Sequence, residues 1–200
     1  MKKLIFMVTA ALMMAVNVNA QEGYEDTKHD VSITFGVESN SQWIDTFENI
    51  FSNYTYENDR YMEPISAEYF YHLNKMLGLG AGFVYGNHKQ DLYDRWSSSK
   101  DKIRIGKSSN SYYTLMPAVK FNFVRKKNFG LYSKAALGVT YRTESFDYID
   151  DSDDYDEKGL LLNWQLSFIG VEAGSPYLRG FAELGIGEQG IVCAGIRYKF

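Results

Sequence analysis

The three histidines are the first residues of this sequence to weigh for chemistry. A histidine beside a serine and a carboxylate can act as the general base of an acyl-transfer reaction. His29 stands in an N-terminal leader and His72 near a short turn, whereas His88 begins a long loop. The candidate partners of His88 are Ser111 or Ser145 with Asp91. No nucleophile motif surrounds either serine, so we predict a loop histidine and no catalytic residue.

The most acidic stretch, DDSDDYDE over residues 150–157, contains the kind of ligand that calcium prefers. It lacks the glycine and the spacing of an EF-hand loop, so a solvated acidic loop is the favoured interpretation, and neither a metal site nor a cofactor is predicted. Cys193 is the only cysteine, which excludes an intrachain disulfide. Only Arg197 is a nearby cation in the sequence, so Cys193 is interpreted as a small strand residue rather than a reactive thiol.

Charged residues recur at every second position of otherwise apolar segments, which is the period of a β-strand. In each predicted strand the charged residues share one face, and together these faces carry charges of both signs. If the strands form a barrel with these faces inside, the predicted members of an ion-pair network in its lumen are Glu68, Lys120, Lys134, Arg142, Glu183 and Arg197. Glu144 and Arg179 lie on the same faces. An unpaired charge in a narrow interior is costly, which favours a structural network. The alternative is a minor conductance in which Glu68 and Glu183 exchange partners with Lys120 and Arg197.

Eight such segments must position these residues. They are expected near 31–38, 62–73, 77–87, 111–124, 129–144, 160–171, 177–187 and 190–200. Long connections at 39–61, 88–110 and 145–159 alternate with short ones at 74–76, 125–128 and 172–176, before a tight Gly187-Glu188-Gln189-Gly190 link. Pro117 falls within a predicted strand and suggests a bulge. An up-and-down antiparallel barrel puts the long and short connections on opposite rims.

The first twenty residues have two lysines, a short apolar run, and small residues at Val18 and Ala20, which is typical of a secretory signal peptide cleaved before Gln21. The expected organisation is therefore signal peptide 1–20, periplasmic leader 21–30 and barrel 31–200. Removal of Lys2 and Lys3 changes the formal charge from −4 to −6. This acidic balance, without a basic face, argues against nucleic-acid binding.

A soluble ligand-carrying barrel would show the same alternation with the apolar face inside. Two features favour charges inside. Glycines share the charged face, where long side chains crossing a narrow lumen need small neighbours. Aromatic residues gather at the two ends of the strands, as in the interfacial girdles of membrane barrels. The girdle residues are Tyr69, Tyr71, Phe121, Phe123, Tyr198 and Phe200 near the short-turn rim, and Tyr85, Tyr113 and Tyr141 near the long-loop rim.

The sequence stops in GIRYKF, and this ending, with strands such as VSITFGVES and EPISAEYFYHLNKMLGLGAGFVYG, resembles the small outer-membrane β-barrels of the OmpX type and the OmpA transmembrane domain. The resemblance implies an eight-stranded antiparallel transmembrane β-barrel in the outer membrane of a Gram-negative bacterium. It also implies that Tyr198 and Phe200 form a C-terminal signature recognised by the barrel-insertion machinery. The expected partners are therefore outer-membrane lipid and that machinery.

Eight strands enclose an interior that side chains just fill, which argues against an open pore. We therefore predict a non-enzymatic outer-membrane protein whose extracellular loops serve envelope structure or surface interaction. The first long loop contains Trp43, Phe47 and Phe51 at helical spacing, and these are the candidate contacts for a protein partner. The alternatives are an enzyme that modifies lipid A or phospholipid, and a narrow channel for small solutes.

Overall fold

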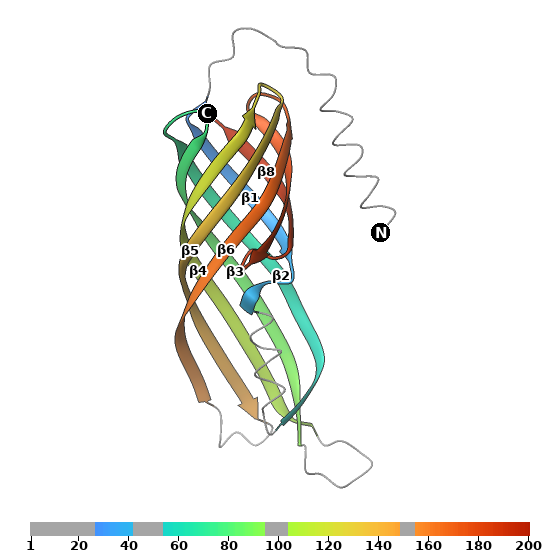
Figure 1. The fold of residues 1–200 in the computed structure, drawn as a ribbon. Helices are drawn as coiled ribbons and strands as arrows, with labels where there is room; N and C mark the ends of the chain where they lie inside the picture. The colour runs from blue at the N-terminus through green and yellow to red at the C-terminus, as the bar shows by residue number, and fades with distance from the viewer. Residues whose placement is uncertain (1–26, 42–53, 95–103, 149–154) are drawn as a thin grey trace.

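The computed structural model describes residues 27–41, 54–94, 104–148 and 155–200. Eight β-strands account for nearly all of them (Figure 1). The strands are β1 (His29–Val37), β2 (Tyr54–His72), β3 (Leu77–Asp94), β4 (Arg104–Arg125), β5 (Phe129–Tyr148), β6 (Tyr155–Gly174), β7 (Leu178–Gly187) and β8 (Val192–Lys199). Among these residues, no helix is long and apolar enough to cross a membrane.

Each strand pairs antiparallel with its neighbours in the sequence, and β1 pairs with β8 to close the barrel. The closing ladder runs from Asp30 opposite Lys199 to Val37 opposite Val192. The predicted all-β class, strand number and strand order are therefore confirmed. The first strand begins at His29, two residues before the predicted start of the barrel at 31.

The strands differ twofold in length. β1, β7 and β8 have 9, 10 and 8 residues, whereas β2 to β6 have 18 to 22. A tilted strand needs about 9–11 residues to cross a bilayer. β1 and β7 therefore fall within this range and β8 is one residue short of it, whereas the five long strands continue beyond the closed barrel as a curved sheet (Figure 1).

This extension, meaning the parts of β2 to β6 that lie beyond the closed barrel, corrects the predicted long loops. Residues 54–61, 88–94, 104–110, 145–148 and 155–159, all assigned to loops from the sequence, belong to strands. Their sequence is mostly polar, and among these ranges only residues 145–148 keep a clear period-two alternation. Apolar and polar residues alternate along a strand only where its two faces meet different surroundings. Backbone hydrogen bonding between strands can continue beyond that point, so most of these residues form strands without the alternation.

Pro117 does not produce the predicted bulge. The pairing of β4 with β5 skips Met116 and Pro117 and resumes in the same register at Ala118. The register instead shifts at other places, between Met62 and Ile65 beside Pro64, and between Ser167 and Ile169 in β6. Proline has no backbone N–H to donate to the neighbouring strand. Here the missing donor interrupts the strand pairing but does not shift its register.

The barrel is apolar outside and polar inside. Large hydrophobic side chains are exposed on the outer face of every strand, including Ile33, Leu115, Leu137, Leu184 and Ile196. At one level of this surface, Tyr85 lies opposite Tyr113, which lies opposite Tyr141, and the rings of the first two are 5.2 Å apart. At the short-turn rim the His29 ring stacks on Phe200 at 5.2 Å.

Candidate functional site

The lumen contains a balanced set of buried charges. Among the described residues five acidic and five basic side chains are buried, and all ten come from the inward faces of strands or from the β7–β8 turn. They are Asp30, Glu68, Glu172, Glu183, Glu188, Lys120, Lys134, Arg179, Arg197 and Lys199. Because burying a single charge without a partner is costly, these numbers favour ion pairing of most of them.

Lys134 is the centre of the middle layer. Its Nζ lies 2.7 Å from Glu68 Oε1 and 2.8 Å from Glu183 Oε2, and the ammonium group is fully buried. The Tyr132 hydroxyl and the Ser167 hydroxyl each donate to Glu183 at 2.7 Å. One ammonium group of β5 therefore joins carboxylates from β2 and β7, which are separated in the barrel by β1 and β8.

Glu172 is the corresponding centre nearer the short turns. Arg179 Nη1 donates to Glu172 Oε1 at 2.7 Å and Arg197 Nη1 to Oε2 at 2.6 Å. Lys199 Nζ also donates to Oε1, and Lys120 Nζ lies 3.6 Å from Oε2. This one carboxylate thus collects cations from β4, β7 and β8.

Asp30 and His72 extend this layer to β1 and β2. One carboxylate oxygen, Asp30 Oδ2, lies 2.8 Å from His72 Nε2 and accepts from Lys120 Nζ at 3.0 Å. Arg197 links the two layers, because Nη2 lies 3.7 Å from Glu183 Oε1 and Nε lies 3.9 Å from Asp30 Oδ2. His72 is therefore a lumen residue and not merely a neighbour of a turn.

Aromatic rings lie against the cations inside the lumen. Lys120 Nζ lies 4.2 Å from the centroid of the Tyr132 ring, and the Arg197 guanidinium lies 4.8 Å from that ring and 4.4 Å from that of Phe181. Ring faces attract desolvated cations by cation–π interaction. Tyr132 and Phe181 thus provide favourable contacts for cations that are buried away from water.

The turn between β7 and β8 folds into the lumen. Glu188 and Gln189, which the sequence placed in an ordinary tight link, are both 2 % exposed. Gln189 Nε2 donates to Glu68 Oε1 at 2.7 Å, and Gln165 Oε1 accepts from the Gln189 backbone at 2.7 Å. We call residues 187–190 the inner turn. It covers the ion-pair network on the side of the long strands.

A close backbone approach fixes the inner turn. A Cβ atom built on Gly36 would lie 1.6 Å from the carbonyl oxygen of Gln189, so only glycine fits at this position of β1. Gly187 and Gly190 have positive φ angles of 137° and 109°, which side chains rarely adopt. The inward fold therefore depends on glycines at both ends of the turn and on the strand it touches.

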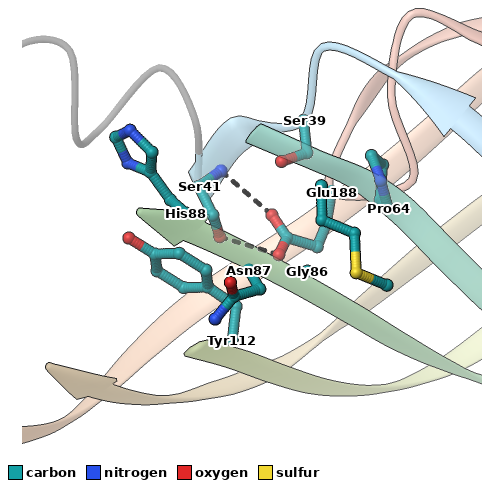
Figure 2. Close-up of a pocket in the computed structure, with 9 residues that line it drawn as sticks. Ser39, Ser41, Pro64, Gly86, Asn87, His88, Tyr112 and Glu188 are labelled. Atoms are coloured by element: carbon teal, nitrogen blue, oxygen red, sulfur yellow. Dashed lines mark hydrogen bonds between the residues drawn. The ribbon is translucent and has the colours of Figure 1, made fainter. Parts of the chain in front are cut away.

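Glu188 differs from the other buried carboxylates because its hydrogen-bond donors in the described part of the chain are neutral. The Ser41 hydroxyl and backbone N–H donate to it at 2.7 and 3.1 Å (Figure 2). Asn163 Nδ2 donates at 2.8 Å and the Thr114 hydroxyl at 3.2 Å. Burial raises the pKa of the Glu188 carboxyl above its ordinary value, against the opposing effect of these hydrogen bonds. Glu188 thus connects the inner turn to the end of the β1 segment, to β4 and to β6.

A small pocket lies beside Glu188 at the long-strand end of the lumen. It is lined by Ser39, Ser41, Met62, Pro64, Gly86, Asn87, His88, Tyr112 and Glu188, and its empty space is about 250 Å³, part of it open solvent. Figure 2 shows the His88 ring pointing away from Glu188. Ser111, a proposed partner of His88, instead accepts a hydrogen bond from Asn87 Nδ2 at 3.0 Å.

The structure brings together five of the six residues predicted for the lumen network: Glu68, Lys120, Lys134, Glu183 and Arg197. The sixth, Arg142, lies apart in the long-strand region, where its Nη2 is 2.8 Å from Glu144 Oε2 and both side chains are partly exposed. Trp43, Phe47 and Phe51 lie outside the described residues, as does most of the acidic run at 150–157. No group of three or more potential metal ligands occurs in the described part of the chain.

Sequence reasoning missed Asp30, Glu172, Glu188 and Lys199 as network members. Asp30 and Glu172 lay just beyond the predicted ends of their strands. The register shift at Ser167 reverses the inward face of β6, so Gln165 and Glu172 both point into the lumen although one is odd-numbered and the other even-numbered. Lys199 shares the face of Arg197, and this parity was the available signal.

No protein-family model matches the chain, and no curated protein matches it. Among solved structures, Ail, the attachment invasion locus protein of Yersinia pestis, bound to the heparin analogue sucrose octasulfate, is 15 % identical, with a TM-score of 0.49 over 86 % of this chain and 99 % of that chain. The N-terminal β-barrel domain of OprF from Pseudomonas aeruginosa is 12 % identical, with a TM-score of 0.46 over 88 % and 100 %. The outer membrane protein OprG of the same organism is 12 % identical, with a TM-score of 0.45 over 90 % and 99 %.

The chain has the fold of the small eight-stranded outer-membrane β-barrels. Its own closed strand order, apolar exterior and charged interior carry this assignment, and they match the architecture predicted from the sequence. The likenesses to solved structures are too distant to transfer any residue role.

Proposed function

We propose that this chain is a non-enzymatic integral outer-membrane protein whose closed barrel holds a five-stranded extension outside the cell. The observation that carries the proposal is the twofold difference in strand length on a barrel with an apolar exterior. β1 and β7 match the span of a bilayer and β8 comes within one residue of it, so the remaining length of β2 to β6 reaches into water. Short turns on the periplasmic side and long connections outside are the arrangement of such barrels.

The charged lumen serves stability and closure in this proposal rather than transport. Lys134 and Arg197 are fully buried, so solvent does not reach the ion-pair network between them. The inner turn lies over that network, held by Gln165, Ser66 and Glu68. An aqueous channel requires more strands than eight.

The extension offers a surface for a protein partner. Strand pairing joins residues 54–64 of β2 only to β3, and residues 155–163 of β6 only to β5, within the described part of the chain. A strand edge with unpaired N–H and C=O groups can bind an extended segment of another protein by strand addition. The predicted loop contacts Trp43, Phe47 and Phe51 belong to the same proposed function.

Labelling of intact cells tests the topology. Cysteine replaces Lys107 in the extension or Lys75 in the β2–β3 turn, both exposed, and a membrane-impermeant maleimide is added. The proposal predicts labelling of K107C in intact cells and of K75C only after the outer membrane is permeabilised. The unsubstituted chain is the control, since Cys193 is buried. Labelling of K75C alone in intact cells, or recovery of the chain in the soluble periplasm, contradicts the proposal.

We also propose that Tyr198 and Phe200 act during assembly. Both side chains are exposed on the outer face, with their rings 5.7 Å apart at the rim where β8 meets β1. Their position leaves the rings accessible to an insertion machinery. Replacing Phe200 with Ala is expected to reduce the amount of assembled barrel in cells severalfold while the purified chain still refolds in detergent. Normal assembly in cells would refute this role.

A further inference from the structure

The short-turn rim of the barrel carries a cluster of cations that neither the lumen network nor the extension uses. Its members, here called the basic rim, are Lys28, Arg125, Lys126 and Lys127. Lys28 and Lys126 are exposed, and the other two are half-buried. The acidic side chains described at this rim, Asp30 and Glu172, are buried and already bound to lumen cations. The rim therefore presents positive charge to its surroundings.

Hydrogen bonds bring the segments of the basic rim side by side. Arg125 Nη2 donates to the carbonyl oxygen of Thr27, and the His72 backbone donates to that of Lys28 at 2.7 Å. Asn122 donates in the same way to the carbonyl oxygen of Met76 at 2.7 Å. The residues before β1, the β2–β3 turn and the β4–β5 turn thus form one continuous patch.

The lumen holds the β4–β5 turn in place from inside. Nη2 of the buried Arg179 donates to the carbonyl oxygens of both Lys126 and Lys127 at 2.7 Å. The turn backbone is therefore fixed while the two ammonium groups remain available for an external ligand. A binding site fixed in advance loses less conformational entropy when its ligand binds.

The position of the basic rim indicates which ligand it meets. Tyr69, Tyr71, Phe121 and Phe123 are exposed on the adjacent outer surface, and aromatic belts lie at the level of lipid headgroups. The cations therefore lie at the headgroup level of the same leaflet. Among the described residues, the opposite end shows exposed charges of both signs, such as Glu38, Glu63, Lys89 and Lys107, and the excess of positive charge lies at this rim.

We propose that the basic rim binds the phosphodiester headgroups of anionic phospholipids in the leaflet that the short turns face. This inference rests on the proposed function, which makes that leaflet the periplasmic one. Cations near a lipid surface strengthen binding of anionic lipid by about fivefold each. Three such cations are expected to contribute on the order of 10- to 100-fold once screening by salt is included.

The test is a titration of phosphatidylglycerol into the folded full chain in zwitterionic detergent, with bound lipid counted by native mass spectrometry. The variant K28Q/K126Q/K127Q removes three rim cations, and K89Q/K107Q/K158Q removes three exposed cations from the other end as a matched control. The proposal predicts at least tenfold weaker phosphatidylglycerol binding by the rim variant alone, with phosphatidylcholine binding unchanged. Binding by the original chain is expected to weaken as salt is raised.

Equal phosphatidylglycerol binding by the original chain and the rim variant overturns the proposal. Binding of purified peptidoglycan sacculi that the rim variant loses, without any lipid preference, also overturns it, because the partner would then be that polymer. In the sequence, Glu22, Glu25 and Asp26 precede Thr27. If a preference for phosphatidylglycerol over phosphatidylcholine appeared only after these three acidic residues were neutralised, the leader would block the rim, which also contradicts the proposal. Heat-dependent gel mobility scores folding of every variant, so failure of the barrel itself is seen separately.

Discussion

Lys134 is the residue whose loss should damage the lumen most, because its single ammonium group pairs with two buried carboxylates at 2.7 and 2.8 Å. Replacing Lys134 with Met keeps the volume and leaves Glu68 and Glu183 without this partner. Removing one member of a buried pair typically costs about 3–5 kcal/mol. We expect a loss of that size in the free energy of unfolding, measured by urea titration in lipid vesicles.

The matched control for this variant is Lys89→Met, since Lys89 is exposed near the long-strand end. Exposed substitutions usually change stability by less than about 0.5 kcal/mol. Adding Glu183→Gln to Lys134→Met should recover part of the loss, because one uncompensated charge disappears. If the two single variants unfold at the same urea concentration, the network does not stabilise the barrel.

Gly36 and Gly86 form a matched pair of glycines in strands. A Cβ on Gly36 would meet the Gln189 carbonyl at 1.6 Å, whereas one on Gly86 would meet nothing within 4 Å. Gly36→Ala must displace the inner turn, and overpacking of this kind typically costs about 1–3 kcal/mol. We expect Gly86→Ala to unfold like the original chain. In planar bilayers the original chain and Gly86→Ala should be silent, and Gly36→Ala should show conductance events. If both variants were equally stable and neither showed conductance, the inner turn would not be what closes the lumen.

The side chains that face the lumen were predictable from the sequence where the period-two pattern of a strand runs without a register shift. Lys134 and Glu183 follow from alternation alone, because their neighbours are apolar. Tyr132 was missed, since an aromatic residue in a membrane barrel is expected to face lipid, yet its ring lies against two buried cations. The local sequence around an aromatic residue does not show which charged side chains of other strands will lie beside its ring in the lumen.

Among the elements, the inner turn is the one whose stability should depend on pH. The folded-state pKa of Glu188 is raised above its ordinary value of 4.5, chiefly by burial. A carboxyl of this kind contributes stability that is present below the unfolded pKa and is lost as pH rises through the folded pKa. Glu188→Gln removes that loss. The variant should therefore gain stability relative to the original chain as pH rises from about 4 to 7.

Urea titrations of both proteins at several pH values across this window measure the effect. The informative quantity is the difference in free energy of unfolding between the two chains at each pH. A difference that stays constant across the window, or that moves in favour of the original chain, would mean that Glu188 remains ionised when folded. In that case the neutral donors around it would suffice to hold a carboxylate.

The number of strands was predictable and their lengths were not. Period-two alternation exists only where one face meets lipid and the other meets the lumen, so it marked the membrane part of each strand. Residues 54–61 and 104–110 show no such contrast, and they form strands because they pair with neighbours already aligned by the barrel. The inner turn gave no sequence signal beyond two glycines, which any tight turn would show.

At the scale of the whole molecule, a barrel with apolar residues outside and paired charges inside is stable in lipid and unstable in water. A soluble carrier buries its hydrophobic side chains around a ligand inside the barrel. In this barrel they lie on the outer face, where water would surround them if the protein were soluble. The closed strand order alone is common to both kinds of protein. The direction of the two faces is therefore the central claim.

Fluorescence quenching tests this claim most directly. A fluorophore is attached to single cysteines at Ile33, Leu115, Leu137 or Ile196, which are 56–61 % exposed on four different strands, in a Cys193→Ser background. Lys75 and Lys107, exposed at the two ends, provide control positions. In vesicles, brominated acyl chains should quench the four strand positions and aqueous iodide should quench only the two controls. Quenching of the strand positions by iodide and not by brominated lipid would contradict the membrane barrel.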